Sequence, residues 1–580
     1  MAQGAIKKVS ARPPPKANKA TKKGATAKTS KPKKLKTSHE KLQRKFAGAL
    51  VAKTEKLLGE RARHLEMIGK GKKTAPEDRL NAKGGSRNAP TTPPASALAH
   101  ARSSLPQRAS PEYLSRHGPA ATLLHIRNDI LPALSGQGVS ARYFGFVTGG
   151  VLPEAEAADN IVSAMDQSAA SHIPDHSVVV DIEHSALSML ADVLGLEAER
   201  FTGSIFTTGA TASNILGLAC GREAVLRKRL LPGESVARLG LLGACAKAGV
   251  TEVQILTSGG HSSLSKAAAV VGLGWDAVKE VSISKEKPWK LDIDEVERRL
   301  QRPGVASVIS ISMGEVNTGL FATSGRDEMQ RLRKLADRYS AWLHVDGAFG
   351  IFVRTLDDSA ENEMLKAATA GLELADSIAA DAHKILNAAK DYQPYDCGVF
   401  YTAHKALMQE TFCNPNAAYL ANTISKDTDM LSSPLDMGLE NSRRFRALPI
   451  YAILVSLGRQ GLTEMVGKMV AVTRALAREI SWLPEYEMLP VLRGTQPDAE
   501  TSEDDGLLSF SHISFILMVR LRNRKKNKTL VDRINESREV FVSGSVWNGV
   551  PVARIAVSSH RTTLADVGGV VELLKRVAAQ

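Results

Sequence analysis

Two short segments of the sequence combine residues that could handle a carbonyl compound. Lys384 directly follows His383 after an apolar run, and Asp346 ends a second apolar run. An unprotonated lysine amine condenses with an aldehyde to form an imine, and a carboxylate at the end of a buried strand needs a cationic partner. A lysine alone would be one solvated charge among 76 basic residues. The neighbouring segments therefore decide the interpretation.

A glycine turn and a histidine add two further functions. Gly209 and the small residues up to Asn214 precede a helix-forming stretch, so backbone N–H groups at a helix start would face a phosphate. Ser213 would add its hydroxyl. His261 follows an apolar strand-like run, and an imidazole can lie flat on an aromatic ring and transfer protons. Each signal also has an ordinary explanation, as a helix cap or a structural histidine.

Together these groups match what pyridoxal 5′-phosphate (PLP) requires of a protein: a lysine for its aldehyde, an acid for its ring nitrogen, a phosphate cradle and a surface on the ring face. We predict PLP held as an imine on Lys384, with Asp346 against the ring nitrogen and no metal ion. Ala348 lies two residues after Asp346 on the same strand face, and it would pack beneath the ring. We expect His344 to be a core or supporting residue.

The elements that must position these residues follow an α/β pattern. From about residue 175, apolar strands alternate with amphipathic helices, as in a mostly parallel sheet covered by helices. Strands are predicted over 253–257, 305–312, 342–345, 377–380 and 398–402. A helix is predicted over 324–339, opened by a capping box of Ser324 and Asp327.

The order changes after about residue 430. A long helix over 448–480, an apolar strand over 507–521, a hairpin turning at Asn548-Gly549 and a last helix over 564–579 predict a smaller α+β domain. We therefore predict a disordered basic tail and linker over 1–95 with one helix near 39–68, an N-terminal helical segment over 96–175, a large PLP-binding domain over 176–430 and a C-terminal small domain over 431–580.

Charge separates the tail from the rest of the chain. Residues 1–100 hold 25 Lys and Arg against 6 Asp and Glu, whereas the remaining residues hold 51 against 55. The near-neutral folded part offers no footprint for nucleic acid, while the tail could contact polyanions. A solvated linker is the simpler interpretation of the tail.

Cysteine spacing and hydropathy bear on location. The four cysteines lack the close pairing of zinc or redox motifs, and no run of eighteen apolar residues occurs. We expect a soluble cytoplasmic protein without disulfides. Lysine clusters in the tail resemble import signals, so a nuclear address is the alternative.

Read in order, the motifs resemble those of the group II PLP-dependent decarboxylases, the family of aromatic-L-amino-acid, histidine, tyrosine and glutamate decarboxylases. The resemblance covers roughly residues 110–575, and it rests on Thr211–Asn214, Gly260–Ser263, His344–Ala348, His383-Lys384 and Ser442–Arg446. It implies a type I PLP fold, usually a homodimer, with a large mostly parallel-sheet domain and a smaller C-terminal α+β domain. It also implies decarboxylation of an L-amino acid, aromatic by the weight of the family, to the amine and CO₂.

The resemblance assigns roles to individual residues. Thr148 matches a segment that lines the substrate pocket of the family. The resemblance implies that Ala212 and Ser213 bind the phosphate of the cofactor, with help from His383. It implies that His261 stacks on the ring and that Ala348 packs against it. It also implies that Asp346 pairs with the ring nitrogen and that Lys384 forms the imine.

Departures from the family pattern leave alternatives open. Aromatic amino-acid decarboxylases carry a tyrosine shortly before the segment that matches 443–446, but residues 430–440 contain none, and Tyr419 is the upstream substitute. Without protonation of the α-carbon, reaction with oxygen would yield an aldehyde. The link over 387–394 is longer than usual and includes Lys390, a rival imine former. The Asp381–Lys384 sequence also resembles sphingosine-phosphate lyases, so a carbon–carbon lyase or an oxidative aldehyde synthase is the alternative.

Overall fold

The computed structural model describes residues 89–111, 113–388, 396–414, 431–491 and 510–580. The stretch from Arg79 to Gln580 forms one compact unit. Most of the predicted tail, the helix expected near 39–68, Lys390 and Tyr419 lie outside the described residues.

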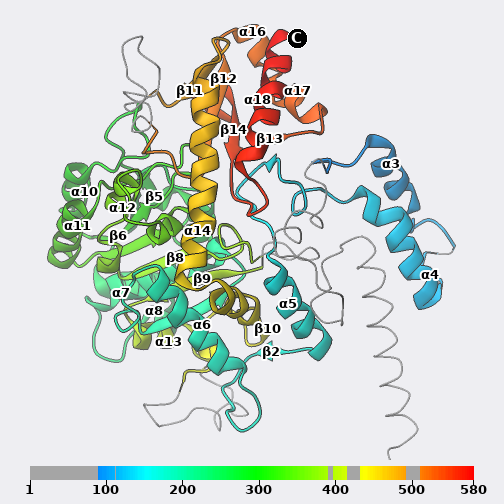
Figure 1. Cartoon of the computed structure of the whole chain (residues 1–580). Coiled ribbons are helices and arrows are strands. Elements are labelled where there is room, and N and C mark those ends of the chain that lie inside the picture. The colour runs from blue at the N-terminus through cyan, green and yellow to red at the C-terminus, as the bar shows by residue number, and fades with distance from the viewer. Residues whose placement is uncertain (1–88, 112, 389–395, 415–430, 492–509) are drawn as a thin grey trace, which may run out of the picture. The chain divides into compact units, whose positions relative to one another are not determined.

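A seven-stranded sheet forms the centre of this unit (Figure 1). β9 runs antiparallel to both of its neighbours, and the other neighbouring pairs are parallel. The five strands predicted for this domain are confirmed, each to within one residue, whereas the strand predicted over 507–521 begins only at Ile516 within the described residues. The strand order is β3 (Gly203–Thr207), β9 (Gly398–Thr402), β8 (Ser377–Asp381), β7 (Trp342–Asp346), β6 (Val305–Ser312), β4 (Glu252–Thr257) and β5 (Val278–Glu280).

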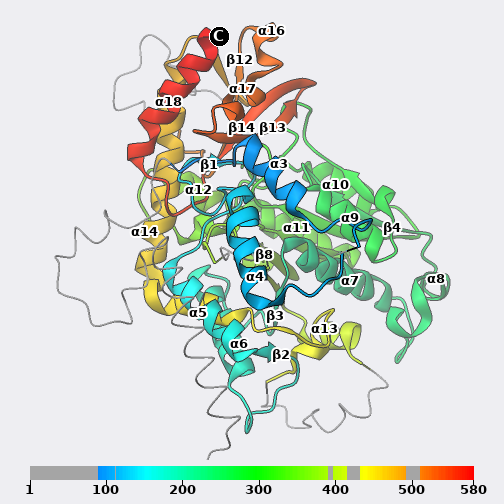
Figure 2. The ribbon, with the colours of Figure 1, turned by 90° about the vertical axis from the view of Figure 1, so that its right-hand side faces the viewer.

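Helices cover both faces of this sheet because successive strand side chains point to opposite sides (Figure 2). On β6, Val308 belongs to one apolar cluster and Ile309 to the other. The Val308 cluster includes α7 (Ala210–Arg227), α8 (Val236–Ala248), α9 (Ser262–Val270) and α13 (Lys405–Phe412). The Ile309 cluster includes α5 (Pro153–Met165), α6 (Val179–Val193), α10 (Ile293–Leu300), α11 (Arg326–Tyr339), α12 (Glu363–Ala368) and α14 (Ala447–Ser481).

The capping box predicted for α11 is wrong. The helix begins at Arg326, its N-cap residue Gly325 makes no side-chain cap, and the N–H of Ser324 donates to Glu328 Oε2 at 2.7 Å. A Cβ at Gly325 would lie 2.4 Å from the carbonyl oxygen of Ala367, so the close approach of the backbone excludes a capping side chain there. A capping box does form at α18 (Leu564–Ala579), between Thr563 and Asp566.

A second, five-stranded sheet lies beside the first (Figure 1). The predicted hairpin turn is confirmed, since Asn548 and Gly549 have φ angles of 48° and 76°, as a two-residue hairpin loop requires. The strand order is β1 (Tyr143–Phe144), β13 (Phe541–Trp547), β14 (Val550–Ala556), β12 (Ile516–Leu521) and β11 (Tyr486–Leu489). The helices α14, α16 (Arg524–Asn527), α17 (Leu530–Glu536) and α18 pack around it. The sheet therefore joins the C-terminal part to a strand from the N-terminal segment.

The N-terminal segment also supplies two helices, α3 (Ala95–Ser104) and α4 (Gly118–His125). No residue of α4 is buried, and Leu123 and Leu124 are 57% and 56% exposed. A short pairing of β2 (Ser168–Ala169) with β10 (Arg443–Arg444) ties this segment to the start of α14. Within the described parts of the chain, no helix has the length and apolar character needed to span a membrane.

Candidate active site

A cavity of about 590 Å³ lies at the carboxyl ends of the parallel strands, where open α/β sheets bind their ligands. Asp346 ends β7, Lys384 follows β8, and His261 follows β4. All three line the cavity, together with Ala348 and His383. The fold thus brings together five of the residues predicted from separate segments.

Lys384 forms an ion pair that the sequence did not suggest. Its Nζ lies 2.6 Å from Asp381 Oδ2, and Asp381 is only 2% exposed. The other oxygen of Asp381 accepts from the N–H of Ala210, at the start of α7, at 2.5 Å. The lysine amine must leave this pair before it can attack an aldehyde. The position of Asp381, three residues before Lys384, was the available signal.

His383 is a neutral ring held beside this pair. Its Nδ1 accepts from the N–H of Cys397 at 3.3 Å, and its Nε2 lies 3.6 Å from Asp381 Oδ1. Burial lowers the pKa of His383. Its proton therefore resides on Nε2, on the side of Asp381.

The start of α7 supplies backbone donors to the cavity. Thr211 and Ala212 line it, and within the described residues no acceptor is found for their backbone N–H groups. Unpartnered N–H groups at a helix start favour an anion. Ser213 does not line the cavity: its side chain is fully buried and its hydroxyl lies 2.8 Å from Thr207 Oγ1, so its role at the phosphate stays a prediction. The helical turn carries Ser213 toward the sheet, and Thr211 offers a hydroxyl at the cavity instead.

Asp346 meets only neutral groups. Its Oδ2 accepts from Asn214 Nδ2 at 2.9 Å, and its Oδ1 accepts from the N–H of Ala348 at 3.3 Å. No lysine, arginine or histidine of the described chain forms an ion pair with it. A half-buried carboxylate without a cation is costly, so the site suits a cationic ligand atom such as a protonated ring nitrogen.

His261 is the N-cap residue of α9. Its Nδ1 accepts from the N–H of Ser263 at 3.2 Å and lies 2.8 Å from Ser263 Oγ. The ring lines the cavity and is exposed to solvent, and partial desolvation by the surrounding protein lowers its pKa. The neutral ring therefore carries its proton on Nε2 and can donate from that atom.

Arg554 was missed from the sequence. It lies on β14, is 4% exposed and lines the cavity, and its Nε donates to the carbonyl of Val316 at 2.6 Å. Burial lowers its pKa to about 10, and none of the carboxylates in the described residues forms an ion pair with it. An arginine within the apolar run 552–556 was the signal. Arg554 places a fixed positive charge at the cavity wall.

Thr148 does not line the cavity. From its segment Phe146 and Val147 do, whereas Thr148 is 3% exposed. The next residue, Gly149, donates its N–H to Ser558 Oγ at 3.1 Å, and a Cβ there would lie 2.2 Å from the carbonyl oxygen of Lys384. This close backbone contact fixes the segment with Thr148 turned into the protein, and its role at a substrate pocket stays a prediction.

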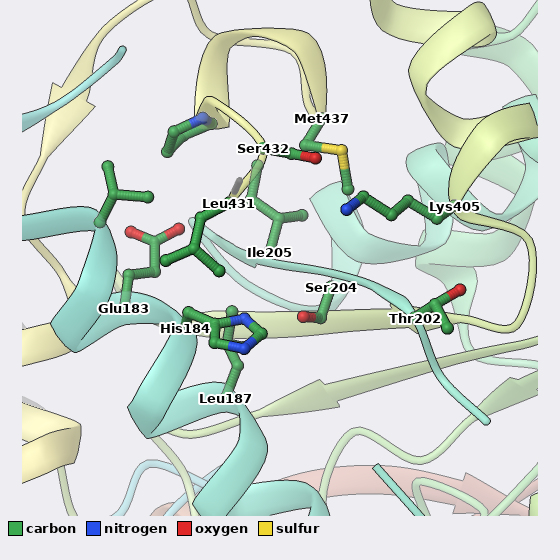
Figure 3. A pocket seen from close by; sticks show the side chains of 12 residues that line it. Glu183, His184, Leu187, Thr202, Ser204, Ile205, Lys405, Leu431, Ser432 and Met437 are labelled. Atoms are coloured by element: carbon green, nitrogen blue, oxygen red, sulfur yellow. The ribbon is translucent and has the colours of Figure 1, made fainter. Parts of the chain in front are cut away.

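A second cavity, of about 60 Å³, lies between α6, β3 and the residues that follow 430 (Figure 3). Its walls include Glu183, His184, Ser204 and Lys405. Glu183 pairs with buried Arg443, so its charge is already matched within the chain. Small-molecule pockets usually enclose roughly 300–1,000 Å³. Only the larger of these two cavities has room for a cofactor and a substrate.

Comparison with known proteins identifies the family. Residues 157–493 match the family described as the pyridoxal-dependent decarboxylase conserved domain, and residues 1–73 match a family described only as a protein of unknown function (DUF2462). The chain belongs to the pyridoxal-dependent decarboxylase family. The predicted family and PLP as cofactor are thereby confirmed.

Individual relatives agree with this family. L-2,4-diaminobutyrate decarboxylase of Acinetobacter baumannii is 26% identical over 294 residues, which are 49% of this chain and 53% of that protein. The chain thus spans about half the length of that relative. The Oryza sativa TDC structure with PLP and tryptamine superimposes with a TM-score of 0.67 at 21% identity, covering 85% of this chain and 94% of that one.

A second similar structure carries a different activity in its title. Rhodiola rosea 4-hydroxyphenylacetaldehyde synthase superimposes with a TM-score of 0.66 at 17% identity, over 85% of this chain and 94% of that one. At these identities the structural likeness shows the fold alone. The predicted type I PLP fold is confirmed, with its large mostly parallel sheet and a smaller second sheet.

Proposed function

We propose that this protein is a PLP-dependent carboxy-lyase that decarboxylates an L-amino acid to the amine and CO₂ at the cavity around Lys384. The observation that carries the proposal is the placement of Lys384 and Asp346 on one cavity, with Asp346 facing no cation of the described chain. When bound, PLP supplies the electron sink that stabilises negative charge at the substrate α-carbon.

The residues that line the cavity fit this cofactor. Thr211 and Ala212 would bind its phosphate through their free N–H groups, and His383 would support that end of the site. Asp346 would bind the ring nitrogen, with Ala348 against one ring face and His261 against the other. Lys384 would hold the aldehyde carbon, and its exchange with the substrate amine would free it as a base close to the α-carbon.

Arg554 is the residue best placed to receive a substrate carboxylate. It is buried and positively charged, and although the Glu315 carboxylate is near enough to raise its pKa, no carboxylate of the described residues forms an ion pair with it. The apolar side chains of Phe146, Val147 and Phe349 form other parts of the wall. We therefore propose an aromatic L-amino acid as the substrate, held by its carboxylate and by an apolar contact.

A panel assay tests the proposal. Purified PLP-loaded protein would be incubated with each L-amino acid, and CO₂ and amine would be measured together. Equimolar CO₂ and amine from an aromatic amino acid is the expected result. Release from an acidic or basic amino acid would correct the substrate class, and no release from any amino acid would overturn the proposal.

An oxidative aldehyde synthase is the second candidate. The absence of a tyrosine in residues 430–440 favours it, because a tyrosine is the expected proton donor to the α-carbon in the family. If oxygen reacts there instead, amino acid, oxygen and water give aldehyde, CO₂, ammonia and hydrogen peroxide. Peroxide equal to CO₂, with no amine, would establish this activity. Cleavage without CO₂ release would instead indicate the carbon–carbon lyase.

Exposed apolar side chains on α4 and on the residue that follows it support a homodimer. Leu123, Leu124 and Ile126 are about half exposed, and an apolar surface of this kind usually marks a protein contact. Phe146, at the cavity wall, is 60% exposed as well. Light scattering should give twice the chain mass, and a monomer mass for fully active protein would contradict the proposal. A cytoplasmic location remains a prediction.

A further inference from the structure

A buried hydrogen-bond chain leads from the sheet to Asp346. Trp342 Nε1 donates to Ser377 Oγ at 2.9 Å, and Ser377 Oγ lies 2.8 Å from His344 Nδ1. His344 Nε2 lies 3.0 Å from Asn214 Oδ1, and Asn214 Nδ2 donates to Asp346 Oδ2 at 2.9 Å. The side chains of Ser377, His344 and Asn214 are fully buried. This chain, which we call the Asn214 relay, ends at the cavity.

The two ends of the relay fix its direction. An ionised carboxylate only accepts, so Asn214 must present its NH₂ to Asp346 and its carbonyl oxygen to His344. His344 Nε2 must then carry the proton. At the other end, the indole N–H of Trp342 only donates, so the Ser377 hydroxyl proton is left to donate to His344 Nδ1. Every donor in this order meets an acceptor, and the reverse order would set the amide oxygen of Asn214 against the carboxylate.

This order of hydrogen bonds requires the ring of His344 to be neutral, and the ring meets that requirement. Burial lowers its pKa to about 4. Its ring also has a prepared place against α7, since a Cβ at Gly217 would lie 2.4 Å from His344 Cε1. Gly217 lies three residues after Asn214, on the same face of the helix.

A weaker branch reaches His261. Asn214 Nδ2 lies 3.5 Å from Ser263 Oγ, at the outer limit of a hydrogen bond, and Ser263 Oγ lies 2.8 Å from His261 Nδ1. The N–H of Ser263 also donates to that nitrogen, so His261 Nδ1 is an acceptor. One amide therefore stands between the proposed ring-nitrogen partner and the proposed ring-face residue.

We infer that Asn214 is a positioning residue of the cofactor site: the relay from Trp342 through Ser377 and His344 locks its amide as a donor to Asp346 and, through Ser263, supports the Nε2–H form of His261. The inference deepens the proposed function and rests on the roles given there to Asp346 and His261. The locked amide holds Asp346 Oδ2, which leaves Oδ1 as the oxygen with capacity for a cofactor atom.

The first experiment measures tautomers in the cofactor-free full chain. Protein labelled with ¹⁵N-histidine would be studied by long-range ¹H–¹⁵N NMR, and the ring of His344 would be assigned by loss of its signals in His344→Gln. We expect a neutral Nε2–H ring that does not titrate above about pH 5, and an Nε2–H ring for His261. A proton on His344 Nδ1 would overturn the inference whether or not any variant folds.

The second experiment measures the affinity for PLP in Asn214 variants. Asn214→Ala removes the donor to Asp346, and the dissociation constant for PLP should rise roughly 10- to 100-fold, as expected for a lost hydrogen bond to a charged group. The His344 ring should lose its single tautomer because its Nε2–H has no acceptor. In Asn214→Asp a second carboxylate would face Asp346, and the affinity for PLP should recover as the pH is lowered.

Asn527→Ala is the matched control. Asn527 is equally buried and satisfies two backbone groups, the N–H of Leu521 and the carbonyl of Pro551, in the second sheet. Its loss should lower stability and leave the histidine tautomers and PLP affinity unchanged. Normal PLP affinity together with unchanged histidine tautomers in Asn214→Ala would contradict the positioning role of Asn214. If Asp346→Asn still lost affinity for PLP in that case, the proposed cofactor site would remain supported, and only the inference about Asn214 would fail.

Discussion

Two carboxylates of this molecule, the buried Glu183 and the half-buried Asp346, differ in how their charge is matched. Glu183 on α6 pairs with Arg443, and both side chains are almost completely buried, so the charge is matched inside the chain. Asp346 receives only hydrogen bonds from Asn214 and from the backbone. The carboxylate beside the small cavity therefore has its counter-charge within the chain, whereas the carboxylate at the large cavity offers a charge that remains to be matched. Burial does not mark a functional carboxylate, since Glu223 and Glu315 are also buried without an ion pair among the described residues. What distinguishes Asp346 is its place on the wall of the large cavity.

The largest expected effect is the loss of the imine-forming amine. Lys384→Ala should lower turnover by roughly a thousandfold or more, since the variant cannot form the covalent link to the cofactor. The absorbance of the protein-bound imine should vanish, while far-UV circular dichroism stays unchanged. If the variant keeps this absorbance, another lysine forms the imine, and Lys390 would be tested first.

The contrast between the two carboxylates predicts that one substitution lowers activity and the other lowers stability. Asp346→Asn should lower kcat roughly 100- to 1,000-fold, as for loss of one preorganised charge, with little change in the unfolding midpoint. Glu183→Gln should leave Arg443 without its counter-charge and cost about 3–5 kcal/mol of folding free energy. Denaturant titration and kcat at saturating PLP would be measured for both. Equal stability losses in the two variants would contradict the comparison.

Arg554 extends the comparison to a buried cation. Arg554→Met keeps much of the apolar volume and removes the charge, so KM should rise roughly 30-fold or more while PLP absorbance is retained. Arg474→Met is the control, because Arg474 is also buried but bonds to Asn362 and to backbone carbonyls in place of lining the cavity. A fall in kcat with unchanged KM would argue against substrate binding by Arg554.

The smallest effect concerns pH. Burial lowers the pKa of His344 from 6.5 to about 4, so the native state takes up the proton only at lower pH than the unfolded chain does. The stability that the neutral ring contributes is complete above about pH 6.5 and is lost as the pH falls toward 4, by about 3 kcal/mol in total. His344→Gln should flatten this decline in urea titrations of the cofactor-free protein.

His512 provides the matched comparison for that measurement. Burial lowers its pKa to about 4 as well, but it lies near Arg474 and outside the Asn214 relay. His512→Gln should also flatten the acid decline in stability, yet leave the affinity for PLP unchanged. If both histidine variants bind PLP as the original protein does, the two rings are equivalent and His344 has no special relation to the site.

The sequence predicted the parts of the site that each lie in one segment. Lys384, Asp346 and His261 could be found because each follows an apolar strand, and the ends of parallel strands share one edge of the sheet. Arg554 could not be placed, since it reaches the cavity from the second sheet and no local pattern relates it to Lys384. Ser213 and Thr148 are direct neighbours of Ala212 and Val147, which do line the cavity. The sequence could not tell which of two adjacent residues faces the cavity. That depends on the helical turn of α7 and on the backbone contact at Gly149.

The fold shows the same division between local and distant information. The five strands of the central sheet and the hairpin at Asn548-Gly549 follow from local apolar runs and turn residues. The addition of β1 to the second sheet depends on pairing between residues about 400 positions apart, Tyr143 with Phe541. The capping box at Ser324 failed for a similar reason, because the carbonyl of Ala367 on a later segment leaves room only for glycine at position 325.

Gly217 has a consequence for how this sequence can change over time. Its missing side chain is the space that the ring of His344 occupies, so an alanine at 217 and a histidine at 344 exclude one another. The two positions should covary among relatives, although they lie far apart in the chain. A lineage that acquires any larger residue at 217 would have to replace His344 as well, and with it the orientation of Asn214.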